Sequence, residues 1–212
     1  MRHALTLSLL AAATLFTLQA RAAEQTRSVA PFTAVSNTGP ISVHIEVGKA
    51  QSIIASGDDD FLADLQTEVV GNELKLRLRH DDTTMSRHQA NLRVTITVPS
   101  LTAFTMAGAG ETVITHVSGD SLAVRFGGAG NLKADGTVRN LKLNIGGVGS
   151  IDTRELHAES ANVNVGGVGS VKVWASARLE ASVGGVGSLT YYGDPKIVNT
   201  SGGGLGSISR GK

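Results

Sequence analysis

The glycine-rich segments near the C-terminus are the residues whose types and spacing could do chemistry, because such segments can bind Ca²⁺ or phosphate groups. The sequence Gly-Gly-Val-Gly-Ser begins at Gly146, Gly166 and Gly184. A Ca²⁺-binding repeat needs an aspartate directly after this motif, at a nine-residue period. Here the period is about twice as long, and the aspartate position holds Ile151, Val171 or Leu189. The repeat therefore does not predict a calcium site.

The sequence also lacks the motifs of nucleotide-binding, metal-binding and catalytic sites. A P-loop requires Gly-Lys-Ser/Thr, which follows none of these glycines, and the residues after Gly128-Ala129-Gly130 lack the spacing of a dinucleotide fingerprint. The acidic run Asp58-Asp59-Asp60 lacks the glycine and the terminal glutamate of an EF-hand loop. No histidine lies in a zinc-protease or nucleophile-elbow motif; the histidines beyond the leader are His44, His80, His88, His116 and His157. We expect no catalytic residue, cofactor or metal.

The spacing of the glycines is the stronger signal. The last glycine of each copy stands at positions 110, 130, 149, 169, 187 and 206, so successive copies are 18 to 20 residues apart. A period this regular is typical of a solenoid whose repeats stack as rungs. The predicted corner glycines are Gly128, Gly130, Gly147, Gly149, Gly167, Gly169, Gly185, Gly187, Gly204 and Gly206. Positive φ or close backbone approach would explain glycine at each corner.

Two alternating segments lie between successive corners and predict two strands in each rung. Inward positions before the corners include Leu141, Leu143 and Ile145, and those after them include Ile151 and Thr153. The same phase in every rung predicts an all-β fold, a parallel β-helix with rungs of about 19 residues. Apolar and polar columns should flank the glycines; they comprise Val148, Val168, Val186 and Leu205, and Asn131, Ser150, Ser170, Ser188 and Ser207.

One domain is expected over residues 23–212, with an N-terminal strand region at 29–106 and the glycine rungs at 107–209. Residues 58–65 predict a short helix with an aspartate at its N-cap, because Phe61, Leu62 and Leu65 have helical spacing. This helix and the N-terminal strands should cap one end of the stack.

Outward residues at equivalent positions of successive rungs form candidate surfaces. The column five residues past each glycine contains Asp135, Arg154, Trp174 and Tyr192, and Asp152 and Lys172 lie in the column beside it. Trp174 and Tyr192, rimmed by the three charged residues Arg154, Lys172 and Asp152, could bind a sugar ring or a partner protein, or could cap the core. The amide row of Asn144, Asn162 and Asn164 could bind a ligand or form a hydrogen-bonded ladder.

Residues 1–22 resemble a secretory leader, with basic Arg2 and His3, an apolar run and Ala20-Arg21-Ala22 before the expected cleavage at Ala23. There is no cysteine, and 19 basic residues oppose 18 acidic ones without a basic tract. This balance makes nucleic acid an unexpected partner. No later segment is apolar enough to span a membrane as a helix. We expect an exported protein.

From Phe32 and the strand Ile41-Ser-Val-His-Ile-Glu-Val, through Val98-Pro99-Ser100-Leu101, to the successive glycine rungs, the chain resembles a bacterial family. That family is called the putative auto-transporter adhesin head GIN domain. The resemblance covers roughly residues 29–209 and implies a β-helix-like protein of Gram-negative bacteria, periplasmic, outer-membrane-associated or extracellular. It implies no enzymatic activity.

These observations favour a non-enzymatic module that binds a protein or glycan of the cell envelope. A polysaccharide-acting enzyme on a β-helix remains an alternative, with Asp135 or Asp152 as the residues to test. A third hypothesis is an assembly protein whose open rungs stack end to end.

Overall fold

The computed structural model describes residues 23–79 and 92–212. The predicted leader at 1–22, together with His80 and His88, lies outside the described residues. Within them the protein is nearly all-β and forms a parallel β-solenoid of about five turns, which confirms the predicted fold class.

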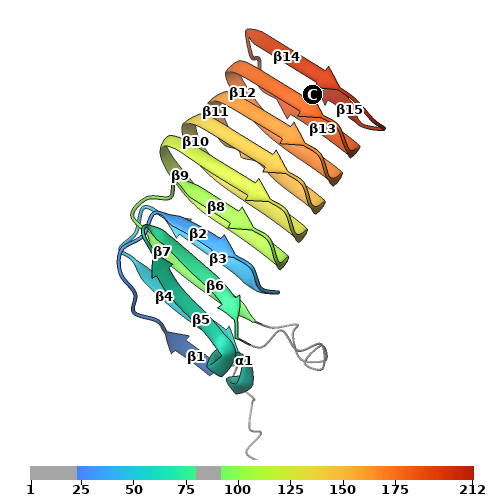
Figure 1. The fold of residues 1–212 in the computed structure, drawn as a ribbon. Coiled ribbons are helices and arrows are strands. Elements are labelled where there is room, and N and C mark those ends of the chain that lie inside the picture. The colour runs from blue at the N-terminus through green and yellow to red at the C-terminus, as the bar shows by residue number, and fades with distance from the viewer. Residues whose placement is uncertain (1–22, 80–91) are drawn as a thin grey trace, which may run out of the picture.

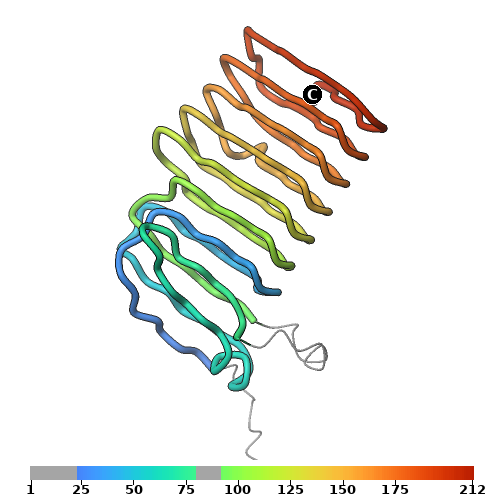
Figure 2. The backbone as a smooth tube through the Cα atoms, in the orientation of Figure 1, coloured from blue at the N-terminus to red at the C-terminus, as the bar shows by residue number. Residues whose placement is uncertain are grey.

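Four long strands form the middle of the solenoid: β9 (Ala109–Phe126), β10 (Ala129–Ile145), β11 (Val148–Val165) and β12 (Val168–Val183). Each leaves a glycine corner in one sheet, bends at the opposite edge and returns in the second sheet (Figures 1 and 2). Neighbouring rungs pair in parallel, and their corners are in register, as in Gly130, Gly149 and Gly169. Three shorter strands complete the last turns: β13 (Val186–Tyr192), β14 (Ile197–Gly202) and β15 (Ser207–Arg210).

The N-terminal strands continue the same two sheets. β2 (Ala34–Asn37) and β3 (Ser42–Val47) form one rung, which lies against β8 (Ala103–Met106) and the start of β9. On its other side lie β6 (Glu73–Leu78) and β7 (Arg93–Val98), also in parallel. The order of rungs along the axis therefore differs from the order in the chain.

Antiparallel strands and the only described helix close the N-terminal end. β4 (Ser52–Gly57) pairs with β7, β5 (Leu65–Val70) pairs with β6, and β1 (Ala23–Thr26) pairs with β4. Between β4 and β5, α1 (Asp59–Asp64) buries Phe61 and Leu62 against the core. The helix prediction is confirmed, although the Asp58 side chain makes no capping hydrogen bond.

The core lies between the two sheets and follows the predicted alternation. The inward positions before the corners are buried in every rung from Leu122 to Val183, and those after the corners are buried from Leu132 to Leu189. Tyr191, at the last such position, is half-buried and packs against the core. Thr153 is fully buried, and its hydroxyl donates a hydrogen bond of 2.8 Å to the carbonyl of Lys172.

The corners pack backbone against backbone. At Gly147, an added Cβ would lie 2.0 Å from the carbonyl oxygen of Gly128 in the preceding rung. At Gly169 it would lie 1.8 Å from the oxygen of Gly149, and φ is also +144°. The first position excludes a side chain by contact, and the second by contact and backbone conformation. The valine column beside them is about half exposed, and Ser150 and Ser170 share a 3.1 Å hydrogen bond in the serine column.

Candidate functional site

Three aromatic side chains lie side by side at the edge opposite the glycine corners. Trp174 follows the buried Val173, so its indole points outward, and Tyr192 is its register partner in β13. On the other side, His157 of β11 pairs with Trp174, and their ring centroids are 4.5 Å apart at 33°. We call the surface around these three rings the aromatic groove.

The sequence predicts Trp174 beside Tyr192 correctly but places Arg154 in the next position of the same column. The structure corrects this, because the register between β11 and β12 shifts between Thr153 and His157. Residues 154–156 therefore form an irregular segment, and His157 takes the position beside Trp174. Such an insertion redirects side chains at the edge of a sheet.

Because of this shift, Arg154 lies beside the three rings of the aromatic groove and not in line with them. Its guanidinium carbon lies 5.7 Å from the centroid of the Tyr192 ring, within the range of a cation–π contact. The groove has a volume of about 670 Å³ and is lined by these residues together with Glu155, Gly193, Arg210, Gly211 and Lys212. Trp174 and Tyr192 are half-buried and His157 is exposed, so the rings with their charged rim offer both an apolar platform and hydrogen-bonding groups.

Asp152 fixes the position of Arg154. Its carboxylate accepts hydrogen bonds from Arg154 Nε at 3.0 Å and Nη2 at 2.7 Å, and Lys172 Nζ lies 3.9 Å away. The hydrogen bond from Arg154 lowers the pKa of Asp152, and the same contact raises the pKa of Arg154. Asp152 is therefore ionised at neutral pH, so it holds no proton for general acid catalysis.

Asp135, the other acid considered from the sequence, has a structural contact. Its Oδ1 accepts a 2.8 Å hydrogen bond from the backbone N–H of His116, a residue with φ of +59°. The carboxylate thus supports a left-handed backbone position in the bend of the preceding rung. Sequence reasoning missed His157, Glu155 and Arg210 as groove residues. The unequal glycine spacing is the only signal of a shifted register.

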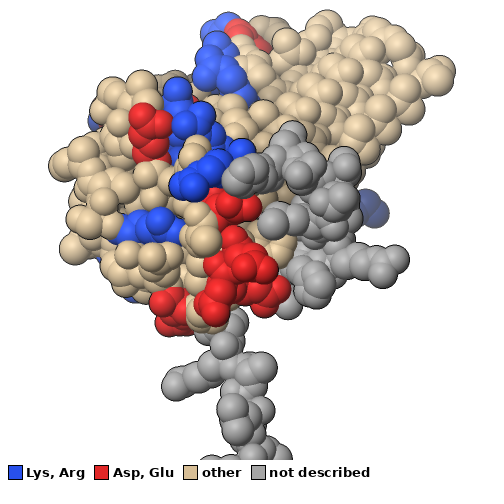
Figure 3. Space-filling view, turned by 60° about the horizontal axis from the view of Figure 1, so that its bottom comes forward, with Lys and Arg blue, Asp and Glu red and all other residues tan. Residues whose placement is uncertain are grey.

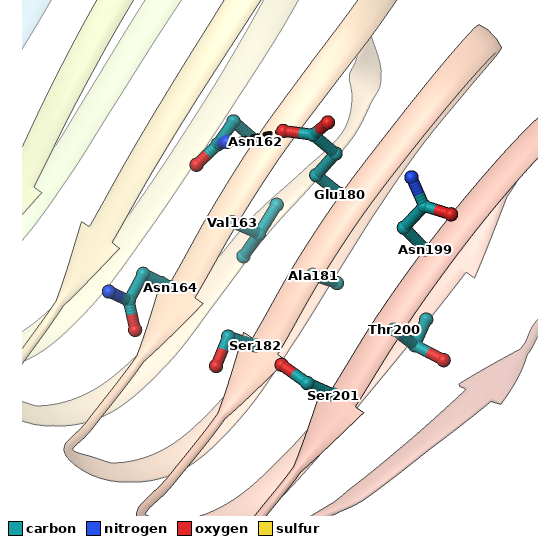
Figure 4. A pocket seen from close by; sticks show the side chains of 9 residues that line it. All are labelled: Asn162, Val163, Asn164, Glu180, Ala181, Ser182, Asn199, Thr200 and Ser201. Carbon is teal, nitrogen blue, oxygen red and sulfur yellow. Dashed lines mark hydrogen bonds between the residues drawn. The ribbon is translucent and has the colours of Figure 1, made fainter.

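The outer face of the second sheet carries the amide row. Asn144, Asn164, Ser182 and Ser201 share one register position in successive rungs. Figure 4 shows Asn164, Ser182 and Ser201 across a shallow depression from Asn162, Glu180 and Asn199. The expected ladder of bonds between asparagines is not found among the described residues. Instead, Asn162 Nδ2 donates to Glu180 Oε2 at 2.9 Å. The hydrogen bond from Arg178, and then the one from Asn162, lower the pKa of Glu180.

Within residues 23–79 and 92–212, no group of three or more histidine, cysteine or acidic residues is arranged to hold a metal ion. Over the same residues, no helix has the length and apolar character needed to cross a membrane. The groups that converge on the aromatic groove are rings, guanidinium groups and carboxylates. This set is suited to binding a ligand by stacking and hydrogen bonding.

Comparison with known proteins gives one family and several related folds. The model of the family described as "Putative auto-transporter adhesin, head GIN domain" matches residues 31–195. A crystal structure of a putative adhesin from Bacteroides fragilis NCTC 9343 is 25% identical with a TM-score of 0.74, covering 91% of this chain and 98% of that chain. One of a putative lipid binding protein from Parabacteroides distasonis ATCC 8503 is 20% identical with a TM-score of 0.47, covering 91% and 98%. No curated protein matches this chain.

Proposed function

Because this chain belongs to the putative auto-transporter adhesin family with a head GIN domain, we propose that it is an exported, non-enzymatic binding module. Its ligand is a glycan of the cell envelope or cell surface, bound in the aromatic groove. The observation that carries the proposal is the row of His157, Trp174 and Tyr192 with Arg154 beside it.

The chemistry of the groove fits a sugar ring. The half-buried faces of Trp174 and Tyr192 offer apolar area that costs little conformational entropy to order. Arg154, which bonds to Asp152, and Arg210, which bonds to Asp194 at 2.8 Å, place guanidinium donors at the rim of the groove. A pyranose has an apolar face bordered by hydroxyl groups, so one ring can use both features at once.

Replacing both Trp174 and Tyr192 with alanine should weaken binding at least tenfold, because about 1.4 kcal/mol corresponds to a factor of ten and two stacking surfaces are lost. The measurement is a glycan array followed by titration calorimetry on the best ligand. Asn164→Ala on the opposite sheet is the matched control and should bind normally. If the folded double variant binds as tightly as the wild type, the groove is not the site. Binding to an envelope protein but to no glycan would change the ligand class.

Membership in an adhesin-like family suggests export. We propose that residues 1–22 direct the chain across the inner membrane and that the mature protein stays in the periplasm, on the outer membrane or outside a Gram-negative cell. The support is the basic start, the apolar run and the Ala20-Arg21-Ala22 cleavage pattern. Mass spectrometry of protein recovered from these fractions should find Ala23 at the N-terminus. Retention of residues 1–22 would contradict a cleaved leader.

A further inference from the structure

The two ends of the solenoid differ in how their strand edges are protected. At the C-terminal end, β14 pairs only with β12 and β15 pairs only with β13. No described residue pairs with the other edge of either strand. Figure 1 shows both strands at the end of the stack, beyond β12 and β13. Unpaired edges of this kind are templates for pairing with another chain.

The backbone groups on these free edges can be assigned. The N–H of Gly203 bonds to Val183 O at 2.8 Å and that of Gly211 to Tyr191 O at 2.8 Å, so both point toward the preceding rung. The N–H and C=O groups of successive residues in a strand point to opposite edges. The N–H and C=O groups of Val198, Thr200 and Gly202 therefore face the free edge of β14. In β15, the same alternation directs those of Ile208 to the free edge.

Apolar side chains accompany these groups. Val198 is 40% exposed, whereas Leu179, one rung earlier, is fully buried. Ile197, in register with the outward Arg178, and Leu205, in the outward valine column, are 49% and 83% exposed. Val198 and Leu179 occupy the same register position. The end of the hydrophobic core is thus open at β14, and covering it would remove apolar area from water.

Charge distinguishes this end from the other. β14 has the sequence Ile-Val-Asn-Thr-Ser-Gly and carries no charge, and the single charge of β15, Arg210, is ion-paired with Asp194. The outer strands of the N-terminal end, β1 and β5, each carry a glutamate. The helix that closes that end begins with acidic residues, and Figure 3 shows acidic side chains gathered there. Charges on edge strands oppose pairing.

From these observations we infer that a second copy of this chain pairs with the C-terminal end, β14 against β14 and β15 against β15, in antiparallel orientation. One twofold axis perpendicular to both sheets produces the two pairings together, which makes the interface isologous. A neutral strand meets its own copy without like-charge repulsion. The protected N-terminal ends remain outside, so assembly stops at a dimer with two aromatic grooves.

The paired edges are short, because β14 has six residues and β15 has four, so we expect the interface to bury less than the roughly 800 Å² per partner of a standard interface. The dimer should therefore dissociate at accessible concentrations, and sedimentation velocity from about 1 to 100 μM should detect a concentration-dependent monomer–dimer equilibrium. A strict monomer across this range overturns the inference. So do species that grow beyond the dimer, because head-to-tail stacking would produce them.

Thr200→Pro tests the pairing itself. It removes an N–H that faces the free edge, so no hydrogen bond inside the protomer is lost, and proline is tolerated on such edges. We expect at least tenfold weaker dimerisation with an unchanged circular dichroism spectrum; Thr200→Val, which keeps the N–H, should dimerise normally. Val198→Lys is the second variant and should also give monomers, because it places a charge at the interface. A dimer of undiminished affinity in either folded variant overturns the inference. Glycan binding by the monomeric variants tests the aromatic groove separately.

Discussion

Replacing Gly147 with alanine should lower the free energy of unfolding by about 3 kcal/mol or more. The new Cβ would lie 2.0 Å from the carbonyl oxygen of Gly128, which accepts a 2.9 Å hydrogen bond from Val148 N–H. Neither atom can move alone, because the distance between rungs is set by the ladder on both sides of the corner. Relief of the clash must therefore separate two rungs. Urea denaturation followed by circular dichroism measures the change.

Gly146→Ala is the control for this prediction, since it changes the adjacent residue in the same corner. A Cβ at Gly146 meets nothing within 4 Å, and its φ is not positive. We expect its free energy of unfolding to stay within about 0.5 kcal/mol of the wild type. Equal destabilisation of the two variants would show that the corner responds to any added methyl group, and close backbone contact would then not be the reason for glycine.

Phe126→Ala should cost about 3 to 5 kcal/mol of folding stability. Phe126 is 1% exposed and lies in register between Met106 in the preceding rung and Ile145 in the following one. Its removal leaves a cavity at the point where the N-terminal rungs join the glycine rungs. In a stack where each rung contacts only its neighbours, a weak interface uncouples the two parts. A second unfolding transition should therefore appear in calorimetry.

Phe126→Leu keeps most of the volume and should cost no more than about 1.5 kcal/mol, with a single transition. A loss below 1 kcal/mol in the alanine variant would mean that the neighbouring side chains collapse into the space. In that case the core at Phe126 is less rigidly packed than its burial indicates.

The sequence predicts the inward positions well because one physical rule sets them all. Side chains alternate along a strand, and a parallel stack repeats the same phase in each rung, so Leu143, Val163 and Ala181 follow from the position of their glycines. The Trp174–Tyr192 pair follows from the same count, because no irregularity separates either residue from its corner.

His157 could not be placed by this count. The glycine spacing shows that rungs differ by one or two residues, but it does not show where the extra residues lie. In the structure the register between β11 and β12 shifts twice, at residues 154–156 and again between Ala158 and Ser160, in the bend opposite the corner, where no repeating glycine fixes the backbone. The same limitation applies to the N-terminal rungs, because the alternation in β6 does not indicate which strand it pairs with, and β2, which is buried at all four residues, shows no alternation.

The rung formed by β2 and β3 has a consequence for the order of folding. On both of its sides lie strands that come later in the chain, β6 and β7 on one side and β8 and β9 on the other. The contacts are therefore distant in sequence: the carbonyl of Thr33 accepts a hydrogen bond from the N–H of Thr102, 69 residues away. In the glycine rungs, by contrast, partners such as Ser150 and Ser170 are 20 residues apart. Closing the longer loop costs more entropy and slows pairing. The C-terminal rungs can therefore form first and provide the edge on which the N-terminal strands dock. Folding then proceeds from the C-terminal half toward the N-terminal half, opposite to the order of synthesis.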